Sequence, residues 1–360
     1  MFVLILTAFW IVIGNSVCRL IFKRNPRKVY CVITTIILAF IMGFRGKYIG
    51  GTDTSVSYIP VFEKICSQSL TQVFSQHQSK DVFFYLVTKM FSYISHDYHL
   101  YFLTIALFVV GSMSRVIYKY SENIVLSYVI YFSLGYFSAG FQLLRLVIAI
   151  SILLFAYKYL MKRKLIPFLI IIAIASLFHA TAIIFIIAYP IASIKIGFKQ
   201  WIFVMCGVIL AFLGKVSIFR ILSVILPAEE RYSTYLSGTY ASSLSITGFL
   251  ILLAIYVTSY FLAYGSDLSD SKIKTYFNLG SLSVAFMALV GSLGEFQRVS
   301  MYFGMYNTLL LPYCLNNTTR FTKESKLILK LLIPTVILLY FFVFAVNGNM
   351  LNEYVFFWQE

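Results

Sequence analysis

Charged residues are scarce in this chain of 360 residues, and acidic residues are the scarcest of them. Only 12% of the residues are Asp, Glu, Lys or Arg, whereas a typical soluble domain carries about 25%. Hydrophobic residues make up 60% of the chain, and the mean hydropathy is +0.87. This composition excludes an ordinary soluble protein and predicts one integral-membrane domain over residues 1–360.

Cysteine is also sparse, and so are the residue patterns that hold metals. The five cysteines are far apart, no Cys-x-x-Cys occurs, and no Cys/His cluster has the spacing of a zinc site. The segments expected outside the membrane carry no Asp-x-Asp pattern and no carboxylate cluster for a divalent ion. We therefore expect no metal, no cofactor and no disulfide framework.

The net charge of +16 raises the question of a nucleic-acid partner. The basic residues, however, fall in short clusters between apolar runs, which is how topology signals are distributed in membrane proteins. No polar segment combines a basic stripe with stacking aromatics. The charge therefore predicts a lipid bilayer as partner and no nucleic acid.

Twelve apolar segments predict an all-α polytopic transmembrane bundle with interfacial helices on its outer face. The run 165–194 is too long for one span and too short for two, so we expect two short helices that meet near His179. Residues 81–95 are aromatic and carry Lys89, which favours an interfacial helix. The twelve segments are residues 2–22, 29–44, 99–118, 124–140, 142–161, 165–178, 180–194, 200–219, 244–264, 274–294, 297–315 and 326–346.

The distribution of positive charge predicts the orientation. With the N-terminus outside, 19 of the 29 Lys and Arg fall on the inner side and 10 on the outer side. Both termini are then outside, and the long outer segments are 45–98 and 220–243. The first apolar run is followed rather than preceded by its positive charges, which favours a spanning helix over a signal peptide.

Charged or titratable residues from four distant segments fall at the outer ends of predicted helices. Arg45 and Asp53 lie in a Gly- and Thr-rich polar turn, Arg145 opens the span 142–161, His179 lies between the short helices, and Arg298 opens the span 297–315. Such residues in a membrane protein are candidates for function. Further candidates close to them are Tyr58, Gln142, Arg231, Glu295 and Tyr302.

Arginine in this setting indicates phosphate binding, because its guanidinium is always charged and bonds two phosphate oxygens at once. Arg45, Arg145 and Arg298 at the outer headgroup level would hold a pyrophosphate whose lipid tail stays in the bilayer. An attacking hydroxyl needs a general base, and both Asp53 and His179 remain open for that role. Taken singly, each residue also fits a structural role, such as an arginine that snorkels to headgroups.

Five motifs follow one another along the chain. They are Arg45…Gly51-Thr52-Asp53-Thr54…Tyr58…Phe62, Gln142-Leu-Leu-Arg145…Ala149, Lys162-Arg163-Lys164, Ala175…Phe178-His179 and Arg298…Tyr302-Phe303. In this order they resemble the EpsG family of Wzy-like polysaccharide polymerases. In the family the arginine usually follows the glutamine closely, whereas two leucines separate Gln142 from Arg145 here. The segment 81–95 has no clear counterpart of a family glutamate, although Asp81 begins it.

The resemblance implies a metal-independent membrane glycosyltransferase of the GT-C type in the inner membrane of a bacterial cell. It would join oligosaccharide repeat units, linked to undecaprenyl pyrophosphate, into a capsular, O-antigen or exopolysaccharide chain on the outer face. A chain-length regulator and a flippase are implied as possible partners.

Two alternatives stay open. One is a transporter or flippase of lipid-linked sugars, which should show polar groups through the whole bilayer depth and often paired inverted halves. Neither feature is visible in the sequence. The other is a ligase that uses the same donor, which differs from a polymerase only in its acceptor.

Overall fold

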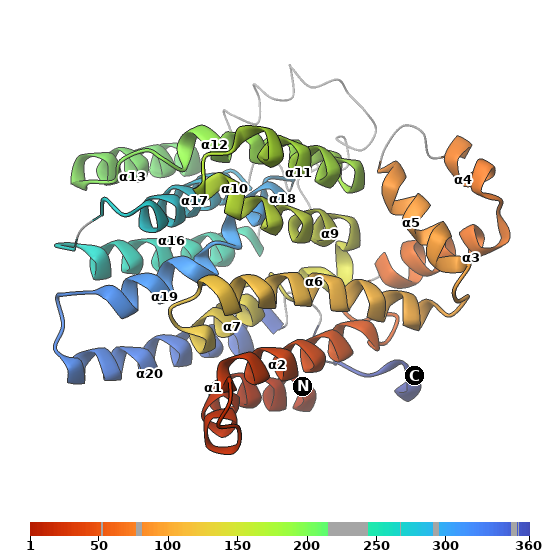
Figure 1. Cartoon of the computed structure of the whole chain (residues 1–360), viewed down its shortest axis with the longest axis horizontal. Coiled ribbons are helices and arrows are strands. Elements are labelled where there is room, and N and C mark those ends of the chain that lie inside the picture. The colour runs from red at the N-terminus through yellow and green to blue at the C-terminus, as the bar shows by residue number, and fades with distance from the viewer. Residues whose placement is uncertain are drawn as a thin grey trace. The chain divides into compact units, whose positions relative to one another are not determined.

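The computed structural model describes residues 1–51, 53–76, 81–214, 244–266, 268–290, 295–346, 351 and 353–360. Over these residues the chain folds into helices without any β-strand (Figure 1), which confirms the predicted all-α polytopic bundle. Arg231 and the whole outer segment 220–243 lie outside the described residues. The chain divides into two compact units: Met1–Ile183 with Leu331–Glu360, and Ile184–Lys330.

Six helices among the described residues are long and apolar enough to cross a bilayer, so the chain is a membrane protein. Each coincides with a segment predicted from the sequence. Four belong wholly to the first unit, one belongs to the second, and the last runs through both. They are Phe2–Ile21 (α1), Pro26–Gly43 (α2), Tyr98–Tyr120 (α6), Leu144–Met161 (α9, η2 and α10), Ile246–Ala263 within α16, and Lys323–Ala345 (α20 and η4).

Shorter helices form the other predicted segments. α17 has 18 residues but begins with Lys272 and Lys274, so it is less apolar than the six spans. These helices are α7 (Ile124–Ser133), α11 (Leu165–Phe178), η3 (Ala180–Ile187) with α12 (Ala188–Ile191), α13 (Phe198–Leu213), α17 (Ser271–Ala288), α18 (Glu295–Gly304) and α19 (Asn307–Asn317), whereas α16, which contains the fifth span, runs from Leu244 to Ala263.

One predicted span is two helices in the structure. The segment 297–315 divides between α18 and α19 at Met305 and Tyr306. There the N–H groups of Tyr306, Thr308 and Leu309 bond to carbonyls three residues back instead of four. The Thr308 hydroxyl also donates to the Met305 carbonyl. This tightening interrupts the helix without any polar run in the sequence, so hydropathy could not reveal it.

In the first unit, α2 lies against both α1 and α6 (Figure 1). Pro26 occupies the first turn of α2. A backbone N–H at that position has no partner within the helix, so proline, which lacks the N–H, costs no hydrogen bond there. The fully buried Tyr30 packs edge-on against Tyr128, and its hydroxyl donates to the Ile11 carbonyl at 2.7 Å. The bond satisfies a buried hydroxyl and ties α1 to α2.

The first outer segment also folds into helices, all in the first unit. Its last helix, α5 (Val82–Ser92), packs on α3 and α4 and contacts α11. With 11 residues it is about 16 Å long, too short to span a bilayer. The helices before it are η1 (Thr54–Tyr58), α3 (Ile59–Ser67) and α4 (Leu70–Gln76).

Two interruptions of the helices in the first unit bring side chains together. α8 (Ala139–Gln142) stops at Leu143, whose backbone is not helical, and α9 (Leu144–Leu153) starts directly after it. α11 ends at Phe178, and His179 is extended with φ −153° and ψ 109° before η3 begins. The predicted break at His179 is therefore present.

Candidate active site

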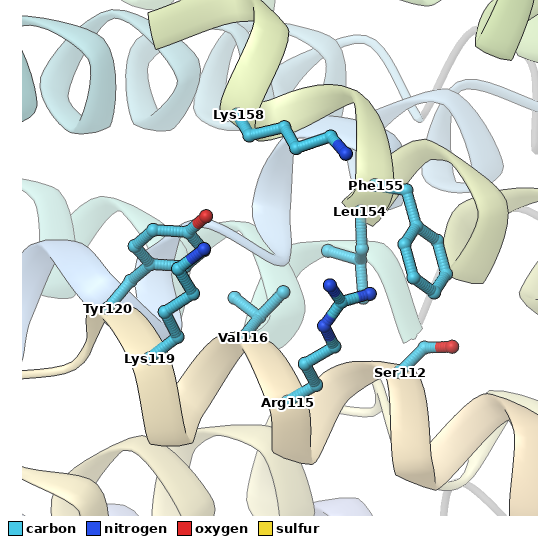
Figure 2. A pocket seen from close by; sticks show the side chains of 8 residues that line it. All are labelled: Ser112, Arg115, Val116, Lys119, Tyr120, Leu154, Phe155 and Lys158. Carbon is cyan, nitrogen blue, oxygen red and sulfur yellow. The ribbon is translucent and has the colours of Figure 1, made fainter.

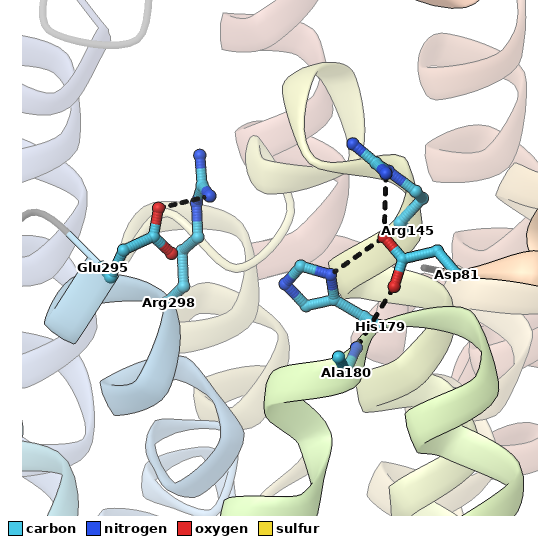
Figure 3. A network of polar contacts seen from close by, with 6 residues as sticks. All are labelled: Asp81, Arg145, His179, Ala180, Glu295 and Arg298. Carbon is cyan, nitrogen blue, oxygen red and sulfur yellow. Dashed lines mark hydrogen bonds and ion pairs between the residues drawn. The ribbon is translucent and has the colours of Figure 1, made fainter. Parts of the chain in front are cut away.

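Asp81, Arg145 and His179 meet in the first unit (Figure 3). The Arg145 Nη1 donates to Asp81 Oδ2 at 2.7 Å, and the same oxygen lies 3.9 Å from His179 Nδ1. The other carboxylate oxygen, Oδ1, accepts the backbone N–H of Ala180 at 3.2 Å. One carboxylate thus joins the start of α5, the first turn of α9 and the break that follows α11.

Local backbone geometry explains this meeting. The first N–H groups of a helix have no partner within that helix, and here the Asp81 carboxylate supplies one for Ala180 at the start of η3. Asp81 itself has φ +53°, a left-handed conformation that aspartate tolerates better than most residues. Arg145 follows the break at Leu143, so its side chain leaves from the end of a span rather than from its middle.

The electrostatics keep the Asp81 carboxylate charged. The side chain is 8% exposed, and burial alone raises the pKa of a carboxyl group. His179, Arg145 and the Ala180 N–H together outweigh that burial, and the pKa of Asp81 is lowered below its ordinary value. An ionised Asp81 therefore faces a fixed guanidinium and an imidazole.

The imidazole of His179 has unused hydrogen-bonding capacity. Its side chain is 16% exposed, and neither ring nitrogen has a hydrogen-bond partner among the described residues. At 3.9 Å, Asp81 is too far for a hydrogen bond but close enough to stabilise a positive charge on the ring. A neutral imidazole placed in this way can accept a proton and gain a counter-ion.

Two tyrosines complete the surroundings of Arg145. Tyr58 and Tyr85 both lie close enough to act on its charge, together with Asp81. Burial raises the pKa of Tyr58. The positive charge of Arg145 offsets part of this rise, and the negative charge of Asp53 adds to it. The Arg145 side chain remains 36% exposed. One edge of the guanidinium is thus held by protein, and the remainder is open to a ligand.

Arg45 is placed differently from Arg145. The residue is 3% exposed, and its guanidinium donates to the carbonyls of Met42 at 2.6 Å and Phe141 at 3.3 Å. It also lies over the Phe102 ring at 4.6 Å and bonds to Thr54 Oγ1 at 3.2 Å. Burial lowers the pKa of Arg45 to about 10, so it stays charged near neutral pH. In this position Arg45 ties the first outer loop to the end of α8.

Asp53 and Gln142 lie next to that anchored loop. Asp53 is exposed and makes no capping bond from its side chain at the start of η1. Gly50 has φ +84°, and a Cβ on it would come within 2.5 Å of the Phe141 Cβ, so only glycine fits there. The half-buried Gln142 faces Gly51 of the same turn. The polar turn is thus packed closely against the α8–α9 junction.

The remaining predicted residues belong to the second unit. Arg298 Nη1 donates to Glu295 Oε1 at 2.7 Å, three residues earlier in the first turn of α18, as Figure 3 also shows. Both side chains are about one-third exposed. Tyr302, one turn further along α18, is buried. The roles expected of these residues stay predictions.

Comparison with known families decides the broad identity of the chain. The model of the EpsG family matches residues 28–357, nearly the whole length. The chain belongs to the EpsG family. EpsG is a family of Wzy-like polymerases, so the match gives this chain a polysaccharide polymerase role of the glycosyltransferase kind. Comparisons with curated proteins and with solved structures gave no match.

Asp81 is the residue of this EpsG-family site that sequence reasoning did not select. Its signals were its position directly before an aromatic helix and its place at the start of the segment in which the family carries a glutamate. Its three partners, Arg145, His179 and the backbone N–H of Ala180, lie 64, 98 and 99 residues away along the chain. Neither hydropathy nor motif spacing reports on a contact of that kind.

Proposed function

We propose that this EpsG-family chain polymerises oligosaccharide repeat units linked to undecaprenyl pyrophosphate on the outer face of the bacterial inner membrane. The product would be a capsular, O-antigen or exopolysaccharide chain. The supporting observation is the cluster of Asp81, Arg145 and His179. It places an arginine side chain that is 36% exposed beside an imidazole whose nitrogens have no hydrogen-bond partner in the described part of the chain.

In this proposal Arg145 binds the pyrophosphate of the donor. The half of its guanidinium that Asp81 does not occupy donates to phosphate oxygens, and Tyr58 adds a hydroxyl beside it. As the bond between the anomeric carbon and the pyrophosphate oxygen breaks, its electron pair stays on that oxygen, where Arg145 stabilises the new charge. Arg298 of the second unit is proposed as a further pyrophosphate ligand, which requires its release from Glu295.

His179 is proposed as the general base. A hydroxyl of the acceptor sugar attacks the anomeric carbon of the donor and forms the new glycosidic bond, while its proton passes to a nitrogen of His179. Asp81 then balances the imidazolium from 3.9 Å, so it acts as a positioning residue. His179 is preferred to Asp53 because its ring nitrogens, which have no hydrogen-bond partner among the described residues, lie beside Asp81, whereas Asp53 is exposed and makes no capping bond from its side chain.

The arginines are proposed to do the work that a divalent ion does in other transferases, so the reaction is expected to be metal-independent. Arg45 is proposed to hold the outer loop in place, and Asp53 and Gln142 are proposed as contacts to sugar. A chain-length regulator and a flippase remain possible partners.

Profiling the glycans of a strain without the chain tests the function. A polymerase defect leaves single repeat units transferred to the final acceptor, without long chains. A ligase defect leaves long chains on the lipid carrier, and a flippase defect leaves lipid-linked units on the inner face. Only the first pattern, restored by the wild-type chain and not by Arg145→Ala, agrees with the proposal.

A further inference from the structure

A second group of cations gathers in the first unit, at the other end of α6 and away from the candidate active site. Arg115 and Lys119 of α6 and Lys158 of α10 (Tyr157–Met161) line one pocket, and Figure 2 shows their side chains approaching it from the two helices. No carboxylate is among the described residues that line it. Three positive charges therefore converge without an acidic partner.

The pocket is separated from the active site by most of the thickness of a membrane. Arg45 lies over Phe102 near the start of α6, whereas Arg115 is 13 residues further along the same helix. At 1.5 Å per residue this is about 20 Å. The span that begins at Arg145 likewise carries Lys158 at its far end. The cations thus lie at the opposite headgroup level from Arg145.

These cations are not used in holding the fold together. Among the described residues the structure records only ring contacts for them: Arg115 over Phe155 at 5.0 Å, Lys119 over Tyr120 at 5.2 Å and Lys158 over Tyr159 at 4.5 Å. Arg115 and Lys158 are both exposed. Ring contacts orient a cation while leaving its N–H donors available to a ligand.

A neighbouring arginine shows the contrast. Arg27 donates to the carbonyls of Tyr118 at 2.9 Å and Ser121 at 2.6 Å, at the C-terminal end of α6. The last carbonyls of a helix carry partial negative charge, which repels an anion. Arg27 covers them, and so it removes the main local obstacle to binding an anion in the pocket.

The size and surroundings of the pocket indicate what it holds. Its volume of about 20 Å³ has room for little more than one water-sized group, so the pocket excludes a sugar and would admit only the oxygens of a phosphate. The Ser112 side chain lines the pocket, and Phe108, one turn earlier on the same face of α6, is 40% exposed. An anion held by Arg115 would therefore have an apolar helix surface beside it, along the depth of the bilayer.

We propose that this pocket, which we call the α6–α10 basic pocket, binds the phosphate of an anionic membrane phospholipid whose acyl chains lie along α6. The lipid is structural or regulatory and distinct from the lipid-linked sugar. Basic pockets between spanning helices commonly bind such headgroups, whereas isolated cations at helix ends serve topology. Convergence from two helices on one pocket favours the first of these roles.

The test is native mass spectrometry of the purified full chain with phosphatidylglycerol or phosphatidylcholine added to the detergent. The pocket variant carries Arg115→Gln, Lys119→Gln and Lys158→Gln. The control variant carries Lys28→Gln, Lys162→Gln and Lys164→Gln, which removes the same charge from exposed sites outside the pocket. The single variant Lys158→Gln is measured as well, and all are first checked for a monodisperse fold.

Wild-type and control chains are expected to retain phosphatidylglycerol in preference to phosphatidylcholine. Lys158→Gln should weaken retention by about fivefold, and the pocket variant by about 100-fold. Equal losses in pocket and control variants would show a bulk charge effect and overturn the proposal. So would unchanged retention in the pocket variant, or displacement of the lipid by millimolar inorganic phosphate, which would assign the pocket to a soluble anion.

Discussion

Arg145 donates to Asp81 across 2.7 Å, and this bond links the first turn of α9 to the residue that begins α5. The bond therefore fixes the direction in which the Arg145 side chain points from the end of its span. A free arginine at a helix end would instead extend to the headgroups. Orientation of Arg145 by Asp81 is therefore the relationship on which the proposed activity depends.

Replacement of Arg145 should remove polymer without removing the protein. Arg145→Ala loses the proposed phosphate ligand, and Arg145→Lys keeps the charge but cannot bond two oxygens with one planar group. Loss of a group that stabilises transition-state charge lowers the rate by about 100-fold or more. Chain length on a polysaccharide gel, at matched membrane levels of the protein, is the measurement. Wild-type chain length in Arg145→Lys would show that a point charge suffices.

Asp81→Asn should lower activity through its neighbours and change the dependence of stability on pH. The lowered pKa of Asp81 means that the folded state favours the carboxylate. The stabilisation is therefore fully present above the ordinary aspartate pKa of about 3.9 and is lost as the pH falls through the lower folded value. The difference in unfolding free energy between wild type and Asp81→Asn in detergent should be largest at pH 6 and should shrink as the pH falls below about 3.9. A constant difference across that range would contradict the assignment.

Arg45→Ala should act on stability first. The substitution leaves the carbonyls of Met42 and Phe141 without their donor in a buried place. We expect a loss of about 2–4 kcal/mol in the free energy of unfolding, because bonds to a charged group contribute about 1.5–3 kcal/mol each and partial relaxation limits the sum. Thermal unfolding in detergent measures it, with Lys47→Ala as the exposed neighbouring control. An unchanged melting temperature with lost polymer would make Arg45 a substrate ligand instead.

The predicted orientation is tested by accessibility of introduced cysteines. Thr54 is 2% exposed and unsuitable, whereas Val56 is 72% exposed on the same segment. In a background with Cys66→Ser and Cys206→Ser, Val56→Cys should react with an impermeant thiol reagent in intact cells. Lys162→Cys, in the turn between α10 and α11, should react only after permeabilisation. The reverse pattern would invert the topology.

Treatment with a chelator tests whether the leaving pyrophosphate is stabilised by the arginines alone or also by a metal ion. If the arginines alone stabilise the leaving pyrophosphate, purified protein should keep its polymerisation rate within about twofold in EDTA, since no charge in the proposed site is removed. The assay follows polymer formed from lipid-linked repeat units over time. A loss restored by magnesium would assign part of the charge stabilisation to a bound ion.

Much of the helical framework could be predicted from the sequence, because a bilayer imposes long apolar runs and basic inner loops. The break at His179 was also predictable, since the run 165–194 fits neither one span nor two. The split between α18 and α19 was not, because it depends on a local change of backbone hydrogen bonding at Tyr306.

The candidate site was predictable in part. Arg145 and His179 could be selected because charge and histidine are rare in membrane segments. Their shared partner Asp81 could not be, since the contact depends on how α5 packs on α11. Arg45 showed the same polar signal as Arg145 in the sequence, yet it points at backbone carbonyls. Sequence alone cannot tell a ligand-facing arginine from one that anchors a loop.

His179, beside Asp81 and Arg145, is proposed to take the proton in glycan polymerisation. The most direct test measures His179→Gln, purified and reconstituted in liposomes, for both donor binding and polymer formation. We expect the donor Kd to stay within about twofold and polymer formation to slow by about 100-fold or more, the usual contribution of a general base. Polymer formation at the wild-type rate, or loss of activity in Asp53→Asn while His179→Gln remains active, would contradict the account.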